Sequence, residues 1–494
     1  MNRATSLICL AILTIFSAFV LAGCGNIAGM SSSSGMTGGS NAIQTSFSIS
    51  DTPPANVTVL RFQIQLTAAS LQPMGSGPAV SLLNSPQVVE LTRLQSESAL
   101  LANPSVPGNT YTSLSATFAN PQMTILNRSN TTYNVGGQSC APGAVCTFNP
   151  TLNKATVTDE SAPFPIMLSG NSPVAFVLHF NVNASVQGDL SVSPTINLKE
   201  LPPLPGNVLA QFHVTGRITA VNSPNFTLQT GFGAVTLNIA TTSSTTYDFD
   251  SACTADNFGC LTVGEVVRVG VSGMPGGALD AFNVELLAPV GMPALEGTVI
   301  AVNTAQNQIQ VALGDFQDDP TARLAAASFA FGRMLTINIS GSTKFSVDTD
   351  GIILPPIAPA LSFAGISDTM IGQTVAVQPS PTAISVTAST NPVAFQILFS
   401  ASSVRLESSE VTATVASTNP SSAPSSFTLN GLPPLFTGET PAVTEIKVDT
   451  VTGTSFQNVS GVSGLADGNT VSVGGLLFNT GTTPTLLAKR VLLH

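Results

Sequence analysis

The sequence predicts an all-β protein in which a β-sandwich is followed by three small β-barrels. First, 43% of the residues are hydrophobic but only 8% are charged, and serine, threonine, valine and glycine replace the charged residues that favour helices. Second, residues 57–66 alternate between apolar and polar side chains, which is typical of a half-buried strand. Third, four short markers recur three times in the same order after residue 207, which indicates repeated units.

The composition also excludes several classes of protein. A disordered acidic chain needs high charge and low hydrophobicity, which is the reverse of this sequence. A helical bundle or coiled coil would be rich in alanine, glutamate, lysine, leucine and arginine. The 15 basic and 26 acidic residues give a net charge of −11, so no nucleic-acid partner is expected, because phosphate would be repelled. The length of 494 residues corresponds to about three or four domains.

Residues 1–23 are expected to be a signal peptide. Arg3 provides a short positive region, and the apolar stretch 7–20 is too short to span a membrane. Leu21-Ala22-Gly23-Cys24 then resembles the lipobox of bacterial lipoproteins. The resemblance implies that Cys24 becomes the mature N-terminus and carries the lipid, including palmitate; the alternative is an ordinary signal peptide with an incidental cysteine.

The same resemblance implies an address in the cell envelope. Gly25 follows the cysteine in place of the aspartate that retains lipoproteins in the inner membrane, which favours a lipid anchor in the outer membrane, on its periplasmic or surface side. The membrane would then be a partner through the N-terminal lipid. Residues 24–45 are rich in glycine and serine, and a flexible tether of this length reaches about 25 Å.

Two cysteine pairs predict two local disulfides. Cys140 and Cys146 flank one short glycine-containing loop, and Cys253 and Cys260 flank another. Export would permit disulfides, and each bridge would contribute roughly 2–2.5 kcal/mol. The spacings differ from the C-x2–4-C knuckles of zinc sites and from a redox-active C-x-x-C, so no metal is expected there.

Residues 46–201 are expected to form the sandwich. The strand that includes residues 57–66 buries one apolar face, the stretches 112–125 and 174–186 have similar patterns, and only 90–101 suggests a helical turn or two. The residues of the first apolar face are Leu60, Phe62, Ile64 and Leu66.

This stretch resembles a family of bacterial lipoprotein domains of unknown function that also follow a lipobox. The matching segments are FSISDTPP at 47–54, VVEL at 88–91 leading to Leu94, and 176–190 as the closing strand. Residues 107–111 (PGNTY) resemble the P-x-G-x-Y start of a strand in that family, with the glycine one residue early. The resemblance implies a transthyretin-like sandwich with no established activity.

A proline-rich boundary at 201–206 separates the sandwich from the repeats, which we expect at 207–288, 294–407 and 410–494. Each unit ends in the pattern A-x-x-V-x-L. A turn glycine precedes this pattern, and a threonine shortly before an aromatic residue precedes the glycine. The closing patterns begin at Ala281, Ala401 and Ala488, the glycines are Gly264, Gly372 and Gly468, and the threonines are Thr246, Thr343 and Thr454. The opening markers are Gly216-Arg217-Ile218, Gly297-Thr298-Val299 and, more weakly, residues 411–415.

Each unit has about five or six short strands, and closing them into a barrel would remove exposed strand edges. The units resemble a second family of unknown function, a small OB-like barrel repeated in secreted bacterial proteins. The second unit carries two insertions. The first, at 314–332, suggests a helical turn around 322–328; the second, at 351–366, is uncharged and broken by prolines. It is either a buried excursion or an exposed apolar patch for a partner.

Few residues are suited to catalysis, and no cofactor is expected. The histidines are His179, His213 and His494. His179 and His213 each stand in an alternating stretch and are expected to be strand-face or core histidines, and the sequence has no G-x-S-x-G, H-E-x-x-H or P-loop motif. Aspartates gather in turns without a complete calcium-loop pattern, so solvated carboxylates are expected and structural calcium is the alternative. These aspartates are Asp248, Asp250, Asp256, Asp315, Asp318, Asp319, Asp348 and Asp350.

The function that these features favour is that of a non-enzymatic, lipid-anchored envelope protein acting as a structural or multivalent binding module. One alternative is a specific glycan or peptide site in the sandwich or the inserted loop. Sugars commonly stack on tryptophan and tyrosine rings, and the sequence has no tryptophan and only three tyrosines, which argues against carbohydrate binding. Polar grooves of asparagine, glutamine and threonine are the alternative kind of carbohydrate site. The last alternative is a hydrolase that uses Asp248 and Asp250.

Overall fold

The computed structural model describes most of the chain from residue 42 to residue 494. The residues outside the description are 1–41, 53–57, 96–97, 170–172, 202–203, 205, 207, 231–235, 250–252, 292–293, 318–332, 350–351, 353–360, 381–384, 389–394 and 438–441. Residues 41–494 form one compact unit. The signal peptide, Cys24 and nearly all of the tether therefore lie outside the described residues, as do most of both insertions in the second repeat. The described residues include no helix long and apolar enough to cross a membrane.

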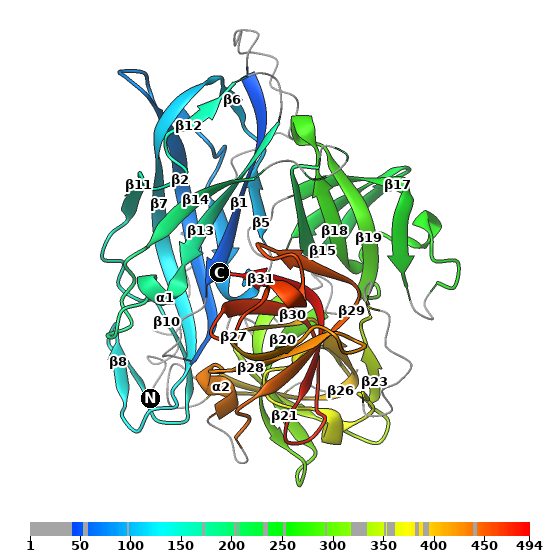
Figure 1. Ribbon diagram of the computed structural model, residues 1–494. Coiled ribbons are helices and arrows are strands. Elements are labelled where there is room, and N and C mark those ends of the chain that lie inside the picture. The colour runs from blue at the N-terminus through cyan, green and yellow to red at the C-terminus, as the bar shows by residue number, and fades with distance from the viewer. Residues whose placement is uncertain are drawn as a thin grey trace, which may run out of the picture. The chain divides into compact units, whose positions relative to one another are not determined.

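The first part of the chain is a β-sandwich of two sheets (Figure 1). In the smaller sheet, the first strand pairs in parallel with a strand from the end of the domain, which closes the sandwich on itself. Its strands are β1 (Ala42–Thr52), β5 (Ala99–Ala102), β6 (Ser105–Pro107), β13 (Val174–Asn181) and β14 (Ile196–Leu201). The larger sheet contains β2 (Thr58–Pro73), β3 (Val80–Ser81), β4 (Gln87–Glu90), β7 (Asn109–Leu126), β10 (Val145–Phe148), β11 (Thr156–Asp159) and β12 (Ile166–Leu168).

The two sheets enclose the core that the alternating pattern predicts. Phe62, Ile64 and Leu66 of β2 are fully buried, and they share the core with phenylalanines from both sheets. The rings of Phe62 and Phe118 make edge-on contacts with Phe180. Burying each such ring contributes on the order of 1.5–3 kcal/mol, so this cluster favours the packing of the two sheets.

One sequence expectation in the sandwich is confirmed and one needs correction. The stretch 90–101, expected to hold a helical turn or two, contains one 3-10 turn at Leu91–Arg93, which Glu90 caps by accepting a hydrogen bond from the amide of Thr92, and β5 begins at Ala99. The strand expected to reach residue 186 ends at Asn181, because the Asn181 side chain caps the short helix α1 (Val182–Ser185). The short capping side chain of Asn181 ended this strand in a way that hydrophobic alternation does not register.

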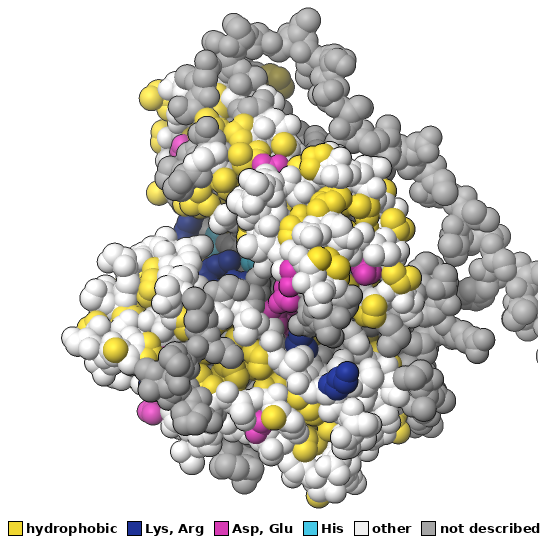
Figure 2. Space-filling model, turned by 90° about the vertical axis from the view of Figure 1, so that its right-hand side faces the viewer, with side chains coloured by type: hydrophobic (Ala, Val, Ile, Leu, Met, Phe, Trp, Pro, Cys, Tyr) yellow, Lys and Arg dark blue, Asp and Glu magenta, His cyan; other side chains and the backbone are white. Residues whose placement is uncertain are grey.

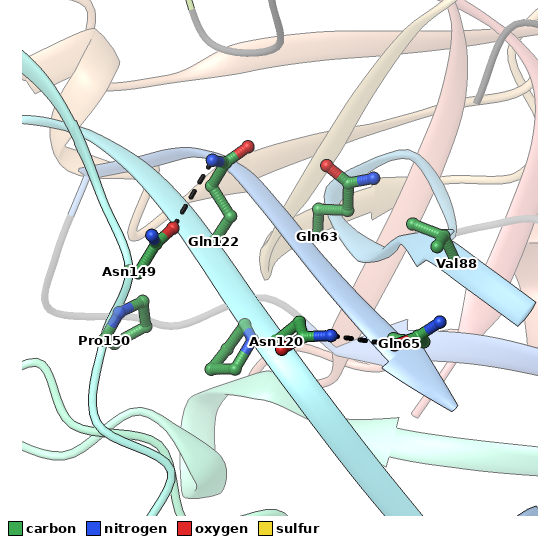
Figure 3. Close-up of a pocket in the computed structure, with 8 residues that line it drawn as sticks. Gln63, Gln65, Val88, Asn120, Gln122, Asn149 and Pro150 are labelled. Atoms are coloured by element: carbon green, nitrogen blue, oxygen red, sulfur yellow. Dashed lines mark hydrogen bonds between the residues drawn. The ribbon is translucent and has the colours of Figure 1, made fainter. Parts of the chain in front are cut away.

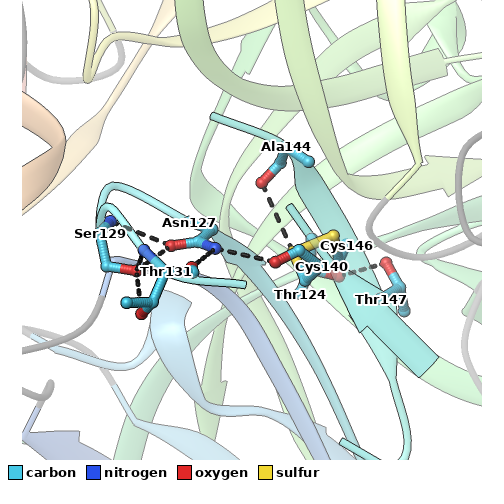
Figure 4. Close-up of a disulfide and its surroundings, with 8 residues drawn as sticks. All are labelled: Thr124, Asn127, Ser129, Thr131, Cys140, Ala144, Cys146 and Thr147. Carbon is cyan, nitrogen blue, oxygen red and sulfur yellow. Dashed lines mark hydrogen bonds between the residues drawn. A yellow bond between two sulfur atoms is a disulfide. The ribbon is translucent and has the colours of Figure 1, made fainter. Parts of the chain in front are cut away.

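Both predicted disulfides are present, Cys140–Cys146 and Cys253–Cys260. The first joins β10 to β9 (Gln138–Cys140), which pairs with β8 (Tyr133–Val135) (Figure 4). The Asn127 side-chain amide donates to the carbonyls of Thr131 and Cys140, at 2.8 and 2.9 Å, and so holds the loop against the end of β7. The bridge and this asparagine organise one loop of the sandwich.

The first and third repeats are closed five-stranded barrels with the same strand order. In each, the third and fifth strands run parallel and all other neighbours are antiparallel. The first comprises, in ring order, β15 (Ala210–Asn222), β16 (Asn225–Thr230), β17 (Thr236–Asp248), β19 (Leu279–Ala288) and β18 (Val266–Gly273). The third comprises β27 (Ser409–Asn419), β28 (Ser426–Asn430), β29 (Ile446–Gln457), β31 (Thr485–Leu493) and β30 (Thr470–Phe478).

The second repeat has the same ring with two modifications. The ring runs β20 (Ala294–Asn303), β21 (Gln308–Gln317), β22 (Met334–Asn338), β26 (Phe395–Glu407) and β24 (Thr374–Pro379). A separate strand, β23 (Lys344–Val347), continues the parallel pairing with β26, where the other barrels have one long strand. The additional strand β25 (Ser385–Ala388) pairs with β26 as well. The all-β prediction with repeated barrels is therefore confirmed.

The recurring markers make the same contacts in each barrel. The amides of Gly264, Gly372 and Gly468 donate to the carbonyls of Ile218, Val299 and Val415 in the first strand. All three glycines have a positive φ, between 87° and 99°, which a side chain would disfavour. The threonine hydroxyl donates to the alanine carbonyl that opens the closing pattern, in the pairs Thr245–Ala281, Thr343–Ala401 and Thr454–Ala488. In the first barrel this threonine is Thr245, one residue before the Thr246 expected from the sequence.

Candidate functional site

Two groups of polar side chains stand out in a protein with few charges. The first is a buried cluster of two arginines and four carboxylates, which we call the ion cluster. The first barrel contributes Arg268 on β18 and Glu285 on β19, and the second barrel contributes Glu296 on β20, Asp348 just after β23, and Arg405 and Glu407 on β26.

The two guanidinium groups bridge the carboxylates of both barrels. Arg268 lies 2.5 Å from Glu296 and 2.5 Å from Glu407, and 3.2 Å from Asp348, so one side chain of the first barrel binds three carboxylates of the second. Arg405 returns the contact, because its Nη2 lies 2.7 Å from Glu285 of the first barrel and its Nε donates to Glu407 at 2.8 Å. These contacts join the two barrels through buried charge-assisted hydrogen bonds.

The pKa values of the cluster follow from burial and from the excess of carboxylates. Burial alone would raise the pKa of Glu407, but Arg405 and Arg268 outweigh it and lower that pKa to about 2. Burial, reinforced by the negative charges of Glu407 and Glu285, raises the pKa of Asp348 well above its usual range. Asp348 therefore retains its proton under conditions in which Glu407 is ionised, and it can donate that proton in a hydrogen bond to Glu407.

Three members of the cluster also form the kind of carboxylate group that could hold a cation. Oxygen atoms of Glu285, Asp348 and Glu407 lie within 4.8 Å of one another, and all three side chains are buried. The two guanidinium groups already contact oxygens of all three carboxyl groups. We therefore interpret the cluster as a structural connection between barrels rather than a metal site.

The ion cluster corrects the expectation that the turn aspartates are solvated. Asp348 is 7% exposed and paired with Arg268, whereas Asp256 is exposed and its carboxylate accepts a hydrogen bond from the amide of Phe249. Asp248 is half-buried at the end of β17. Asp250, Asp318, Asp319 and Asp350 lie outside the described residues, and so does the side chain of Asp315.

His179 and His213 lie on strands, and His494 directly follows the last residue of β31. His213 of β15 packs edge-on against Phe282, and His179 of β13 packs 6.2 Å from the ring of His494. Burial, followed by the positive charge of Lys199, lowers the pKa of both His179 and His494 to about 4. His494 Nε2 lies 2.6 Å from the hydroxyl of Ser472, but Ser472 is fully buried, so this serine cannot reach a substrate from solvent.

The second group of polar side chains lines a groove on the outer face of the larger sheet, which we call the amide groove (Figure 3). Its volume is about 630 Å³, within the range of about 300–1,000 Å³ that is usual for small-molecule sites. The lining residues are Gln63 and Gln65 of β2, Val88 of β4, Asn120, Pro121 and Gln122 of β7, and Asn149 and Pro150 after β10.

A β-bulge shapes the centre of the groove. Gln63 pairs with Gln122 and Gln65 pairs with Ala119, so Asn120 and Pro121 together stand opposite the single residue Ile64. Asn120 has a φ of 49°, in the left-handed region that asparagine tolerates better than most residues. Bulges of this kind redirect side chains and are common beside functional sites.

The amides of the groove form two pairs and keep further hydrogen-bonding capacity (Figure 3). Asn120 Nδ2 donates to Gln65 Oε1 at 2.9 Å, and Gln122 Nε2 donates to Asn149 Oδ1 at 3.4 Å. Glu90, the cross-strand partner of Gln63, turns its carboxylate to the backbone amides of Phe62 and Thr92 and does not line the groove. The lining residues include no ionisable side chain.

The sequence pattern predicted neither the amide groove nor the ion cluster, because alternation shows which side chains face outward but not what they meet there. Alternation correctly separates Gln63 and Gln65 from the buried Phe62 and Ile64, but it does not show which polar face is hollowed. The Asn-Pro pair at 120–121, inside a stretch expected to be a strand, was an available signal for the bulge, because proline cannot donate to a β-ladder. For the ion cluster, the signal was a charge between valine and leucine of the closing pattern, at Glu285 and Arg405.

Comparisons with known proteins add no assignment. No family model matches the chain, and no curated protein matches it. A solved structure of the Drosophila Unr cold-shock domains, CSD456, aligns with 57% of this chain and 97% of its own length at 10% sequence identity. The TM-score of that alignment is 0.13, which is too low to support any argument about fold or function.

Proposed function

We propose that this protein is a non-enzymatic binding protein of the cell envelope, anchored to the membrane by a lipid on Cys24. The observation that carries the binding part of the proposal is the amide groove, a neutral, solvent-facing site of about 630 Å³ on the outer face of the sandwich. Side chains of this kind can hold a ligand by hydrogen bonds, but they do not transfer protons near neutral pH.

The distribution of charge supports the non-enzymatic part. Among the described residues, Arg268 and Asp348 have pKa values raised well above their usual range, and both belong to the buried ion cluster, where the arginines pair with the carboxylates. The face of the molecule in Figure 2 carries mostly neutral and hydrophobic side chains with few charged ones. Because the charges of the ion cluster join barrels and the groove exposes neutral amides, the protein is suited to binding a ligand by hydrogen bonds.

The lipid anchor rests on the sequence Leu21-Ala22-Gly23-Cys24. An anchor with two or more acyl chains would hold the protein stably at a membrane, because each buried methylene contributes about 0.8 kcal/mol. The glycine- and serine-rich residues that follow Cys24 would then allow the folded part to extend away from the lipid surface.

The anchor predicts the behaviour of a single variant. In a bacterial host, Cys24→Ser should abolish incorporation of radiolabelled palmitate and move the protein from the detergent phase to the aqueous phase in a detergent-partition assay. Cys9→Ser is the matched control, because Cys9 lies within the apolar part of the signal peptide, and it should leave both readouts unchanged. Palmitate labelling that persists in Cys24→Ser would contradict the proposal.

A further inference from the structure

We propose that the amide groove binds an uncharged glycan chain. This inference rests on the proposed binding function and specifies its ligand. The groove carries no charge: five primary amides line it and no ionised group does, so a phosphate, a sulfate or a carboxylate would find no counter-charge there. A ligand that hydrogen-bonds without net charge, such as a chain of neutral sugars, matches this lining.

The paired amides leave a pattern of hydrogen-bond donors and acceptors that suits sugar hydroxyls. The Asn120–Gln65 bond leaves Asn120 Oδ1 as an acceptor and Gln65 Nε2 as a donor. The Gln122–Asn149 bond leaves Gln122 Oε1 as an acceptor and Asn149 Nδ2 as a donor. A sugar hydroxyl both donates and accepts, so neighbouring hydroxyls of one ring can satisfy a donor and an acceptor at each pair.

The shape of the groove also suits a sugar chain. The bulge at Asn120 and Pro121 interrupts the regular ladder between β2 and β7, and one amide pair contains the bulge residue Asn120 while the other contains Gln122, the residue that follows the bulge. Val88, which is 38% exposed, and the two prolines supply apolar surface against which the C–H groups of a sugar ring can pack. The groove therefore combines polar contacts with a small apolar surface, as small-molecule sites generally do.

An extended peptide fits the groove less well. Peptides commonly bind a sheet by adding a strand to a free edge, where backbone groups are unpaired. Here β2 and β7 pair with each other along the groove, so its floor presents side chains instead of a strand edge.

The experiment is a titration of the full-length, detergent-solubilised protein with two neutral hexasaccharides, followed by saturation-transfer NMR. Chitohexaose carries acetamido groups and cellohexaose carries only hydroxyls. Binding of either supports the proposal, and preferential binding of chitohexaose would assign the recognised chemistry to the acetamido group. Absence of binding by both hexasaccharides would overturn it, as would displacement of a bound hexasaccharide by an uncharged glycine-serine peptide at equal concentration.

The variants localise the binding to the groove. The double variant Gln65→Ala with Gln122→Ala removes one amide from each pair and should weaken binding by about tenfold or more, as expected for the loss of two neutral hydrogen-bonding groups. Gln229→Ala is the matched control, because Gln229 is an exposed strand glutamine in the first barrel, and it should bind as the parent protein does. Equal affinity of the double variant and the control, at matching melting temperatures, would overturn the proposal.

The outcome can be separated from the proposed anchor. Binding is measured in detergent and does not depend on Cys24, whereas the palmitate and partition assays do not depend on the groove. A protein that is lipidated but binds neither hexasaccharide would therefore refute only the glycan assignment.

Discussion

Replacing Arg268 with methionine should lower the free energy of unfolding by about 3–5 kcal/mol, because it leaves buried carboxylates without their partner. Arg268 binds Glu296, Asp348 and Glu407 of the second barrel, and its removal leaves Arg405 as the remaining guanidinium of the cluster. Urea unfolding followed by circular dichroism measures the loss. Because these contacts join the two barrels, the unfolding transition of both barrels should move to a lower urea concentration.

The matched control for this prediction is Lys447→Met. Lys447 also pairs with a carboxylate, Asp449, at 2.9 Å, but its side chain is 48% exposed. An exposed pair of this kind contributes about 0–1 kcal/mol, because water and salt screen it. If Arg268→Met and Lys447→Met lost the same stability, the interpretation of the ion cluster as a connection between barrels would be wrong.

Replacing Gly372 with alanine should lower the free energy of unfolding by about 2–5 kcal/mol. Its φ is 87°, where a side chain costs about 1–2 kcal/mol, and an added Cβ would lie 2.3 Å from the ring of Phe436, which adds an overpacking cost of about 1–3 kcal/mol. Phe436 belongs to the short helix α2 (Pro434–Thr437) of the third repeat, so the contact also crosses between repeats. Thermal unfolding measures the change.

The equivalent glycine of the third barrel separates the two costs. Gly468 also has a φ of 87°, but an added Cβ there would meet nothing within 4 Å. Gly468→Ala should therefore show only the backbone cost of about 1–2 kcal/mol. An equal loss in both variants would show that the Phe436 contact contributes nothing.

The repeated barrels could be predicted from the sequence because their markers serve the barrel's own closure. The turn glycine bonds to the first strand, and the threonine bonds to the alanine of the closing pattern, in every unit. Each barrel has the same strand order and needs the same closing hydrogen bonds, so the residues that make them recur in the sequence of every unit. The one-residue difference at Thr245 shows the limit of such a signal, since adjacent threonines are equivalent in the pattern but not in space.

Contacts between the repeats left a weaker signal. Arg268, Glu285 and Arg405 alternate with buried valines and leucines, as residues that point out of their own barrels do. Whether an outward-facing charge meets water or a neighbouring barrel depends on packing between repeats, which alternation does not encode. The same limit applies to the amide groove, where the outward position of Gln63 and Gln65 was evident but the bulge at Asn120 was not.

The ion cluster joins the first and second barrels, and a double-mutant cycle between Arg268 and Glu407 tests this connection most directly. The three variants are Arg268→Met, Glu407→Gln and the combination of both, compared with the parent by urea unfolding. Direct contact of these side chains across the two barrels, at 2.5 Å, predicts a coupling free energy of about 2–3 kcal/mol. Losses that add to within about 0.5 kcal/mol would show that the two residues do not interact, and would contradict the claim.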